Sequence, residues 1–162
     1  MYMTKKKTIC IDFDGVIADY SDGYQGEDKF GDMVANADIG TQTLKKKGWR
    51  IIIYTTRPVT DALKKYLADN KIAYDYINEN PDQPEGSDTA KGCKIAADVY
   101  LDDRAVSFSG NWEWTISDIA WFQPWSRPKD DMKKKMENSY DENDIWKRGG
   151  EKRTLAGVRS NT

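Results

Sequence analysis

The chain contains no histidine and only two cysteines. Without histidine, Ser-His-Asp hydrolysis, histidine-ligated zinc and histidine phosphotransfer are excluded. The two cysteines, Cys10 and Cys93, are too few for a disulfide framework, and they make a structural zinc site improbable. A reducing, cytoplasmic environment fits this composition. We therefore expect any bound metal ion to have oxygen ligands, which favours magnesium.

Long apolar runs are also missing, since no stretch reaches the roughly 18 residues of a membrane span. Lysines at positions 5–7 precede an apolar run that is only as long as a strand and is interrupted by Asp12, so we expect no secretion signal and no membrane partner. The length of 162 residues suits one domain with a single core.

Charge is distributed unevenly along the chain. Residues 126–162 hold ten Lys or Arg and seven Asp or Glu, a net charge of +3, whereas residues 1–125 have a net charge of −5. Apolar periodicity also ends near residue 125, which predicts a globular domain over 1–125 and a charged extension over 126–162. The simpler interpretation is that the extension is solvated. The sharper interpretation is that it folds on a partner subunit, as in a homo-oligomer, or contacts a polyanion.

Strand and helix patterns alternate along the globular part. Strands are predicted near residues 9–13, 49–54, 72–77 and 98–101, and helices near 33–47, 60–70 and 112–122. This alternation is typical of a parallel sheet with helices on both faces. The sequence thus predicts an α/β fold with a single Rossmann-like domain.

Residues with reactive side chains recur where these strands end. They are Asp12 and Asp14 after the first strand, Thr55 after the second, and Asp102 and Asp103 after the last, with Lys91 and Lys94 shortly before that last pair. Parallel strands bring such ends together at one edge of the sheet, where open α/β sheets build their active sites. Neighbouring carboxylates repel each other, and a divalent cation is the simplest compensation. This set suits phosphoryl transfer by a carboxylate nucleophile with a second carboxylate as acid and base.

The order of these residues resembles the haloacid dehalogenase (HAD) superfamily over roughly residues 8–122. The run Asp12-Phe13-Asp14-Gly15-Val16 is similar to the first motif of that superfamily, Thr55 to its second, Lys94 to its third and the pair Asp102-Asp103 to its fourth. The resemblance implies that Asp12 is the nucleophile and Asp14 the general acid and base. It also implies that Thr55 binds the phosphoryl group and that Lys94, favoured over the nearby Lys91, neutralises charge.

The same resemblance implies a Mg²⁺ site. Its ligands would come from Asp12, the backbone carbonyl of Asp14, and the pair Asp102-Asp103, with Asp103 favoured as the direct ligand. Further residues are candidates for substrate binding on their position alone, namely Gly15, Thr56, Arg57, Arg104 and Lys91. Either arginine could hold a substrate anion or pair with a local acid. The tryptophans at 112, 114, 121 and 125 could stack on bases, but their spacing favours packing in the core.

The acid at position 14 decides between reactions within the superfamily, because its dehalogenases lack an acid there and its phosphatases have one. Too few residues separate the motifs for a large cap domain, so the chain resembles a capless phosphatase. The loop from Tyr20 to Phe30 is then the candidate for a lid. We expect a magnesium-dependent phosphomonoesterase acting on a nucleotide or sugar phosphate. Two alternatives stay open: a phosphatase of nucleic-acid 3′ or 5′ ends, and a HAD-like binding or regulatory protein without turnover.

Overall fold

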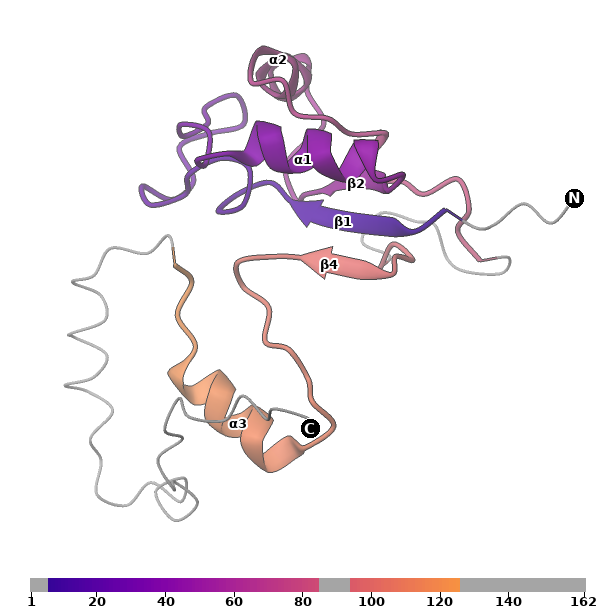
Figure 1. Ribbon diagram of the computed structural model, residues 1–162. Helices are drawn as coiled ribbons and strands as arrows, with labels where there is room; N and C mark the ends of the chain where they lie inside the picture. Colours follow the sequence, from indigo (N-terminus) through magenta and orange to yellow (C-terminus); the bar gives the residue numbers. More distant parts are fainter. Residues whose placement is uncertain (1–5, 85–93, 126–162) are drawn as a thin grey trace, which may run out of the picture. The chain divides into compact units, whose positions relative to one another are not determined.

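A computed structural model describes residues 6–84 and 94–125 (Figure 1). The elements are β1 (Thr8–Asp12), α1 (Ala37–Lys46), β2 (Arg50–Tyr54), α2 (Asp61–Asp69), β3 (Tyr76–Ile77), β4 (Val99–Leu101) and α3 (Trp112–Trp121). The strands form one parallel sheet in the order β3-β2-β1-β4. This is the predicted α/β fold, and its described residues contain no large cap domain.

The chain divides into two compact units. Among the described residues, the first unit comprises 6–84, 94–105 and 123–125 and contains the sheet with α1 and α2. The second comprises 106–122 and contains α3. The candidate site residues that follow β1, β2 and β4 all lie in the first unit.

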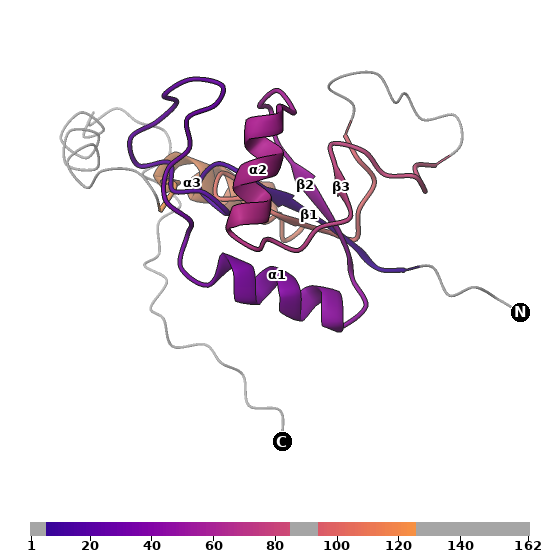
Figure 2. The ribbon, with the colours of Figure 1, turned by 90° about the horizontal axis from the view of Figure 1, so that it is seen from above.

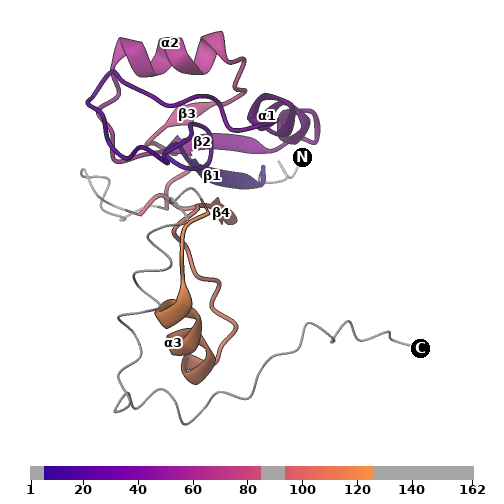
Figure 3. The ribbon, with the colours of Figure 1, turned by 90° about the vertical axis from the view of Figure 1, so that its left-hand side faces the viewer.

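The core of the first unit fills one face of the sheet. The alternate residues Ile9 and Ile11 of β1 pair in register with Ile51 and Ile53 of β2, and all four are buried. Leu63 and Leu67 of α2 complete this buried cluster, and α1 adds half-buried side chains to it. Both helices therefore cover the same face, as Figure 3 shows.

The sequence predicted helices on both faces, and the described residues of this unit differ from that prediction. The connections from β1 to β2 and from β2 to β3 both step in the same direction along the sheet. Since such crossovers are almost always right-handed, they place their helices on one side. The other face carries a smaller cluster of Cys10, Ile52 and Ile95. Burial raises the pKa of the Cys10 thiol to about 11, as expected for a packing residue.

One helix and one strand are shorter than predicted. The first helix begins at Ala37 because Met33 pairs with Ala18 in an isolated bridge and Asn36 takes a left-handed φ of 65°. The third strand is limited to Tyr76–Ile77. Helix α2 is capped by Thr60, whose hydroxyl accepts a hydrogen bond from the Leu63 N–H at 3.2 Å.

Helix α3 is capped by Asn111, whose side chain accepts a hydrogen bond from the Trp114 N–H at 3.1 Å. Its tryptophans are exposed, with Trp112 at 67%, Trp114 at 53% and Trp121 at 63%, so the prediction that they pack in a core is wrong. A spacing of two residues turns a helix by about 200°, which puts Trp112 and Trp114 on opposite sides. None of the described helices has the length and apolar character needed to cross a membrane.

Candidate functional site

Three carboxylates meet at the carboxyl end of the parallel strands. Asp12 is the last residue of β1, and β1 pairs with β4 through Ile11 and Leu101, so Asp102 and Asp103 follow at the same edge. One carboxylate oxygen from each of Asp12, Asp102 and Asp103 lies within 4.8 Å of the others. The loop that follows β1 lies at this same end of the strand (Figure 2). The structure thus brings together three of the four acids that the sequence singled out.

The acids of this group differ in how far they are exposed to water. Asp102 is exposed, whereas the side chain of Asp103 is only 1% exposed. The pKa of Asp12 is raised to about 7, first by burial and then by the charges of Asp102, Asp103 and Asp14, while a hydrogen bond from the Phe13 N–H lowers it. A cation among these oxygens would remove this unfavourable crowding. The three acids form a group that can hold a metal ion.

Gly15 connects this group to the loop after β1. Its φ is +87°, and a Cβ at this position would lie 2.4 Å from Asp103 Oδ2. Its N–H donates a 2.7 Å hydrogen bond to the Ala18 carbonyl, and its own carbonyl accepts one of 2.7 Å from Trp125 Nε1. Only glycine meets both the left-handed φ and the close approach of the Asp103 carboxylate. Gly15 was also predicted to bind the substrate, and that role stays a prediction.

The side chain of Asp14 is not one of the three acids of this group, and it pairs with Arg57. Arg57 Nε donates to both carboxylate oxygens of Asp14, at 2.9 Å to Oδ1 and 2.8 Å to Oδ2. The Arg57 side chain is only 4% exposed, and its Nη1 donates to the Gly26 carbonyl at 2.9 Å. Its guanidinium also lies 4.9 Å from the centre of the Tyr24 ring and 5.1 Å from that of Phe30. Arg57 thus pairs with a local acid, one of the two roles expected, and ties that acid to the candidate lid.

Thr55 is buried at the end of β2 and is held through its backbone by Asn78. The Asn78 side chain accepts a hydrogen bond from the Thr55 N–H at 2.8 Å and donates one to the Thr55 carbonyl at 2.7 Å. The Thr55 hydroxyl accepts a 3.1 Å hydrogen bond from the Arg57 N–H. Sequence reasoning missed Asn78, although its place directly after β3 makes it one more polar residue at the carboxyl end of a strand.

Replacing Asn78 by glycine is expected to lower the free energy of unfolding by about 1–3 kcal/mol, because two part-buried hydrogen bonds are lost. Asn78 has a φ of 56°, which glycine adopts without strain, so the loss reports the hydrogen bonds rather than the backbone. Asn36 has a φ of 65° and makes no capping hydrogen bond with its side chain, so Asn36→Gly is the matched control. Urea unfolding of the two variants measures the difference. Equal losses of stability would show that the hydrogen bonds between Asn78 and Thr55 do not stabilise the fold.

The remaining predicted residues have varied surroundings. Lys94 Nζ lies 4.7 Å from the centre of the Tyr100 ring, and Thr56 is exposed. The Arg104 guanidinium lies 5.1 Å from the centre of the Tyr20 ring and makes a 3.9 Å ion pair with Asp103. Lys91 lies outside the described residues, as does the extension 126–162. The roles of these residues in substrate binding stay predictions.

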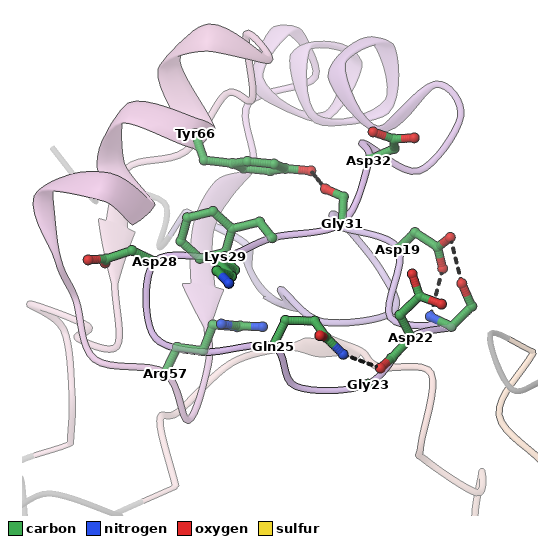
Figure 4. Close-up of a pocket in the computed structure, with 12 residues that line it drawn as sticks. Asp19, Asp22, Gly23, Gln25, Asp28, Lys29, Gly31, Asp32, Arg57 and Tyr66 are labelled. Atoms are coloured by element: carbon green, nitrogen blue, oxygen red, sulfur yellow. Dashed lines mark hydrogen bonds between the residues drawn. The ribbon is translucent and has the colours of Figure 1, made fainter.

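A pocket of about 610 Å³ lies along the loop after β1, with the candidate lid forming much of its wall (Figure 4). Its charged lining consists of four aspartates, at positions 19, 22, 28 and 32, with Lys29 and Arg57. Tyr66 closes one side, where its hydroxyl donates to the Gly31 carbonyl at 3.0 Å. Burial and the charges of Asp32, Asp14 and Asp19 raise the pKa of Tyr66 to about 12. This excess of negative charge disfavours a polyanionic ligand.

No known protein-family model and no curated protein matches the chain. A solved structure of a conserved protein from Bacteroides thetaiotaomicron aligns over 71% of this chain and 90% of its own, with 22% identity and a TM-score of 0.47. Two structures of a Pnkp1/Rnl/Hen1 complex, one described as an RNA repair complex, align with 18% and 17% identity and TM-scores of 0.42 and 0.44. They cover 70% and 78% of this chain but only 38% and 46% of the matched chains. This likeness concerns the fold and identifies neither a family nor an activity.

Proposed function

We propose that the protein is a magnesium-dependent phosphomonoesterase of the HAD type, with Asp12 as the nucleophile. The observation that carries the proposal is the group of Asp12, Asp102 and Asp103 at the carboxyl edge of a parallel sheet. Asp14 and Thr55 follow the two central strands at that edge, in the order that the superfamily motifs require. The four-stranded sheet and the absence of a large cap from the described residues agree with a capless phosphatase.

The residues present fit a magnesium ion. All three side chains offer carboxylate oxygens, which are the ligands that Mg²⁺ prefers. We propose Asp12, Asp102 and Asp103 as ligands, with the backbone carbonyl of Asp14 as a fourth. When bound, the ion would offset the charge of the carboxylates and of the phosphoryl oxygens.

The chemical steps belong to Asp12 and Asp14. A carboxylate oxygen of Asp12 attacks phosphorus, the bond from phosphorus to the leaving oxygen breaks, and an aspartyl phosphate forms. Asp14 gives a proton to the leaving oxygen, and then takes one from the water that attacks phosphorus and releases phosphate from Asp12. Both oxygens of Asp14 accept from Arg57, so this carboxyl must share or release that contact when it transfers a proton.

Thr55 and the basic residues would hold the phosphoryl group. The Thr55 hydroxyl oxygen accepts from the Arg57 N–H, which directs the hydroxyl hydrogen elsewhere, toward a substrate oxygen in our proposal. We propose that Lys94 neutralises phosphate charge, a role that requires its ammonium to move from the Tyr100 ring. Thr56, Arg104 and Gly15 remain the proposed neighbours of the substrate, together with Lys91.

Phosphate release from a panel of mononucleotides, sugar phosphates and phosphorylated oligonucleotide ends tests this function. We expect release with Mg²⁺ and none with EDTA. Preference for the oligonucleotide ends would favour the end-processing alternative, against which the acidic pocket wall counts. Stabilisation by Mg²⁺ in a thermal melt without release from any substrate would overturn the catalytic proposal and favour a binding protein.

A further inference from the structure

Trp125 contacts the backbone of the candidate site from the far end of the described chain. Its indole Nε1 donates a 2.7 Å hydrogen bond to the carbonyl of Gly15, a residue 110 positions earlier. The Cα of Gly15 faces the Asp103 carboxylate so closely that a Cβ there would lie 2.4 Å from Oδ2. The indole and the acidic group therefore contact the same glycine. The indole binds its carbonyl, and the Asp103 carboxylate lies against its Cα.

Trp125 as a residue is nevertheless 63% exposed. The hydrogen bond uses the only polar atom of the side chain and fixes the edge of the ring, while most of the apolar surface stays in water. A fixed and exposed indole is suited to stacking against a planar ring, since such contact buries apolar area without ordering a flexible side chain. An anchor for the chain alone would need the hydrogen bond but not the exposed ring.

A cation also lies beside the acidic group. The Arg104 side chain is 50% exposed, lies against the Tyr20 ring and is 3.9 Å from Asp103 Oδ1. Arg104 thus lies at Asp103, and Trp125 lies at Gly15, the glycine that the Asp103 carboxylate approaches. A ligand that carries a phosphate and a planar base matches both features, whereas a sugar phosphate matches only the first.

We infer that Trp125 is a specificity-determining residue that stacks on the base of a nucleoside monophosphate whose phosphate lies at Asp12. This inference rests on the proposed function, and it selects nucleotides over sugar phosphates as the substrate class. The sequence suggested stacking for Trp125 only as the less favoured interpretation, because the contact with Gly15 joins residues that are distant along the chain.

The test compares adenosine 5′-monophosphate with ribose 5-phosphate, which is the same phosphate ester without the base. Three variants of the full chain are compared with the wild type: Trp125→Ala, Trp125→Phe, which keeps a ring but loses the N–H, and Trp112→Ala as a control. Trp112 is 67% exposed and belongs to the other unit. We expect Trp125→Ala to raise the KM for the nucleotide about tenfold more than the KM for ribose 5-phosphate. Trp125→Phe should lie between Trp125→Ala and the wild type, because it keeps a ring but loses the hydrogen bond that fixes it, and Trp112→Ala should retain all of the preference.

A binding measurement separates failure of this inference from failure of the proposed function. Calorimetric titration of the Asp12→Asn variant, with and without Trp125→Ala, reports affinity for both ligands in the absence of turnover. Weaker binding of the nucleotide alone on loss of the ring supports the inference even if no phosphate is released. The inference would be overturned if both ligands lost affinity equally, if neither lost affinity, or if the nucleotide did not bind. In each of these cases, phosphate release from ribose 5-phosphate would still support the catalytic proposal.

Discussion

Replacing Asp12 by asparagine is expected to reduce phosphate release by at least about 1,000-fold, because an amide cannot form the aspartyl phosphate on which both half-reactions depend. The change removes one negative charge and keeps the size and shape of the side chain, so the sheet should stay intact. Asp69→Asn is the matched control, since Asp69 is an exposed acid on α2 that pairs with Lys65. Malachite green detection of phosphate measures the rates, and circular dichroism checks the fold. Substantial release by Asp12→Asn would sink the mechanism.

The same variant also tests the crowding of charge in the three-acid group. Because burial and neighbouring acids raise the folded pKa of Asp12 from 3.8 to about 7, its ionisation destabilises the metal-free protein as the pH rises through this range. In EDTA, Asp12→Asn should therefore melt about 5 °C above the wild type at pH 8, with a difference that shrinks toward pH 4. Mg²⁺ should raise the melting temperature of the wild type and have less effect on the variant. A variant that melts below the wild type at pH 8 in EDTA would contradict the crowding.

The sheet and the location of the site could be predicted from the sequence because they depend on local patterns. The runs at Ile9–Ile11 and Ile51–Ile53 are apolar and rich in β-branched isoleucine, and the acids and the threonine follow where these strands end. Parallel pairing then brings Asp12 beside Asp102 and Asp103 without any further information. The alternation of strand and helix was sufficient for the fold class.

Other parts of the site could not be predicted because they depend on contacts between distant residues. Strand β1 ends at Asp12, and the Asp14 carboxylate pairs with Arg57, a residue 43 positions further along the chain. The hydrogen bonds between Asn78 and Thr55 join the ends of two different strands. The contact of Trp125 with Gly15 spans most of the described chain. No periodicity in the sequence signals either one. The faces covered by α1 and α2 likewise follow from the strand order, which local patterns do not determine.

Replacing Gly15 by alanine is expected to disable the site while most of the fold persists. The added methyl group would lie 2.4 Å from Asp103 Oδ2 and 2.6 Å from its Cγ, so the carboxylate must move. The Asp103 side chain is 1% exposed and has little room to do so. A displacement of about 1 Å in a ligand of the metal ion can cost on the order of 100-fold in rate. We expect this loss in phosphate release together with weaker stabilisation by Mg²⁺ in a thermal melt.

Gly23→Ala separates the contact with Asp103 from the cost of the backbone conformation. Gly23 has a φ of +70° and no atom within 4 Å of a built Cβ, whereas Gly15 has a φ of +87° and meets Asp103. Both variants should lose about 1–2 kcal/mol of stability, because a residue with a Cβ disfavours the left-handed region. Only Gly15→Ala should also lose its response to Mg²⁺ and its activity, because only there does the new methyl group displace an acid of the group. If both variants respond to Mg²⁺ as the wild type does, the approach of Asp103 to Gly15 is not what holds this carboxylate in place for the metal ion.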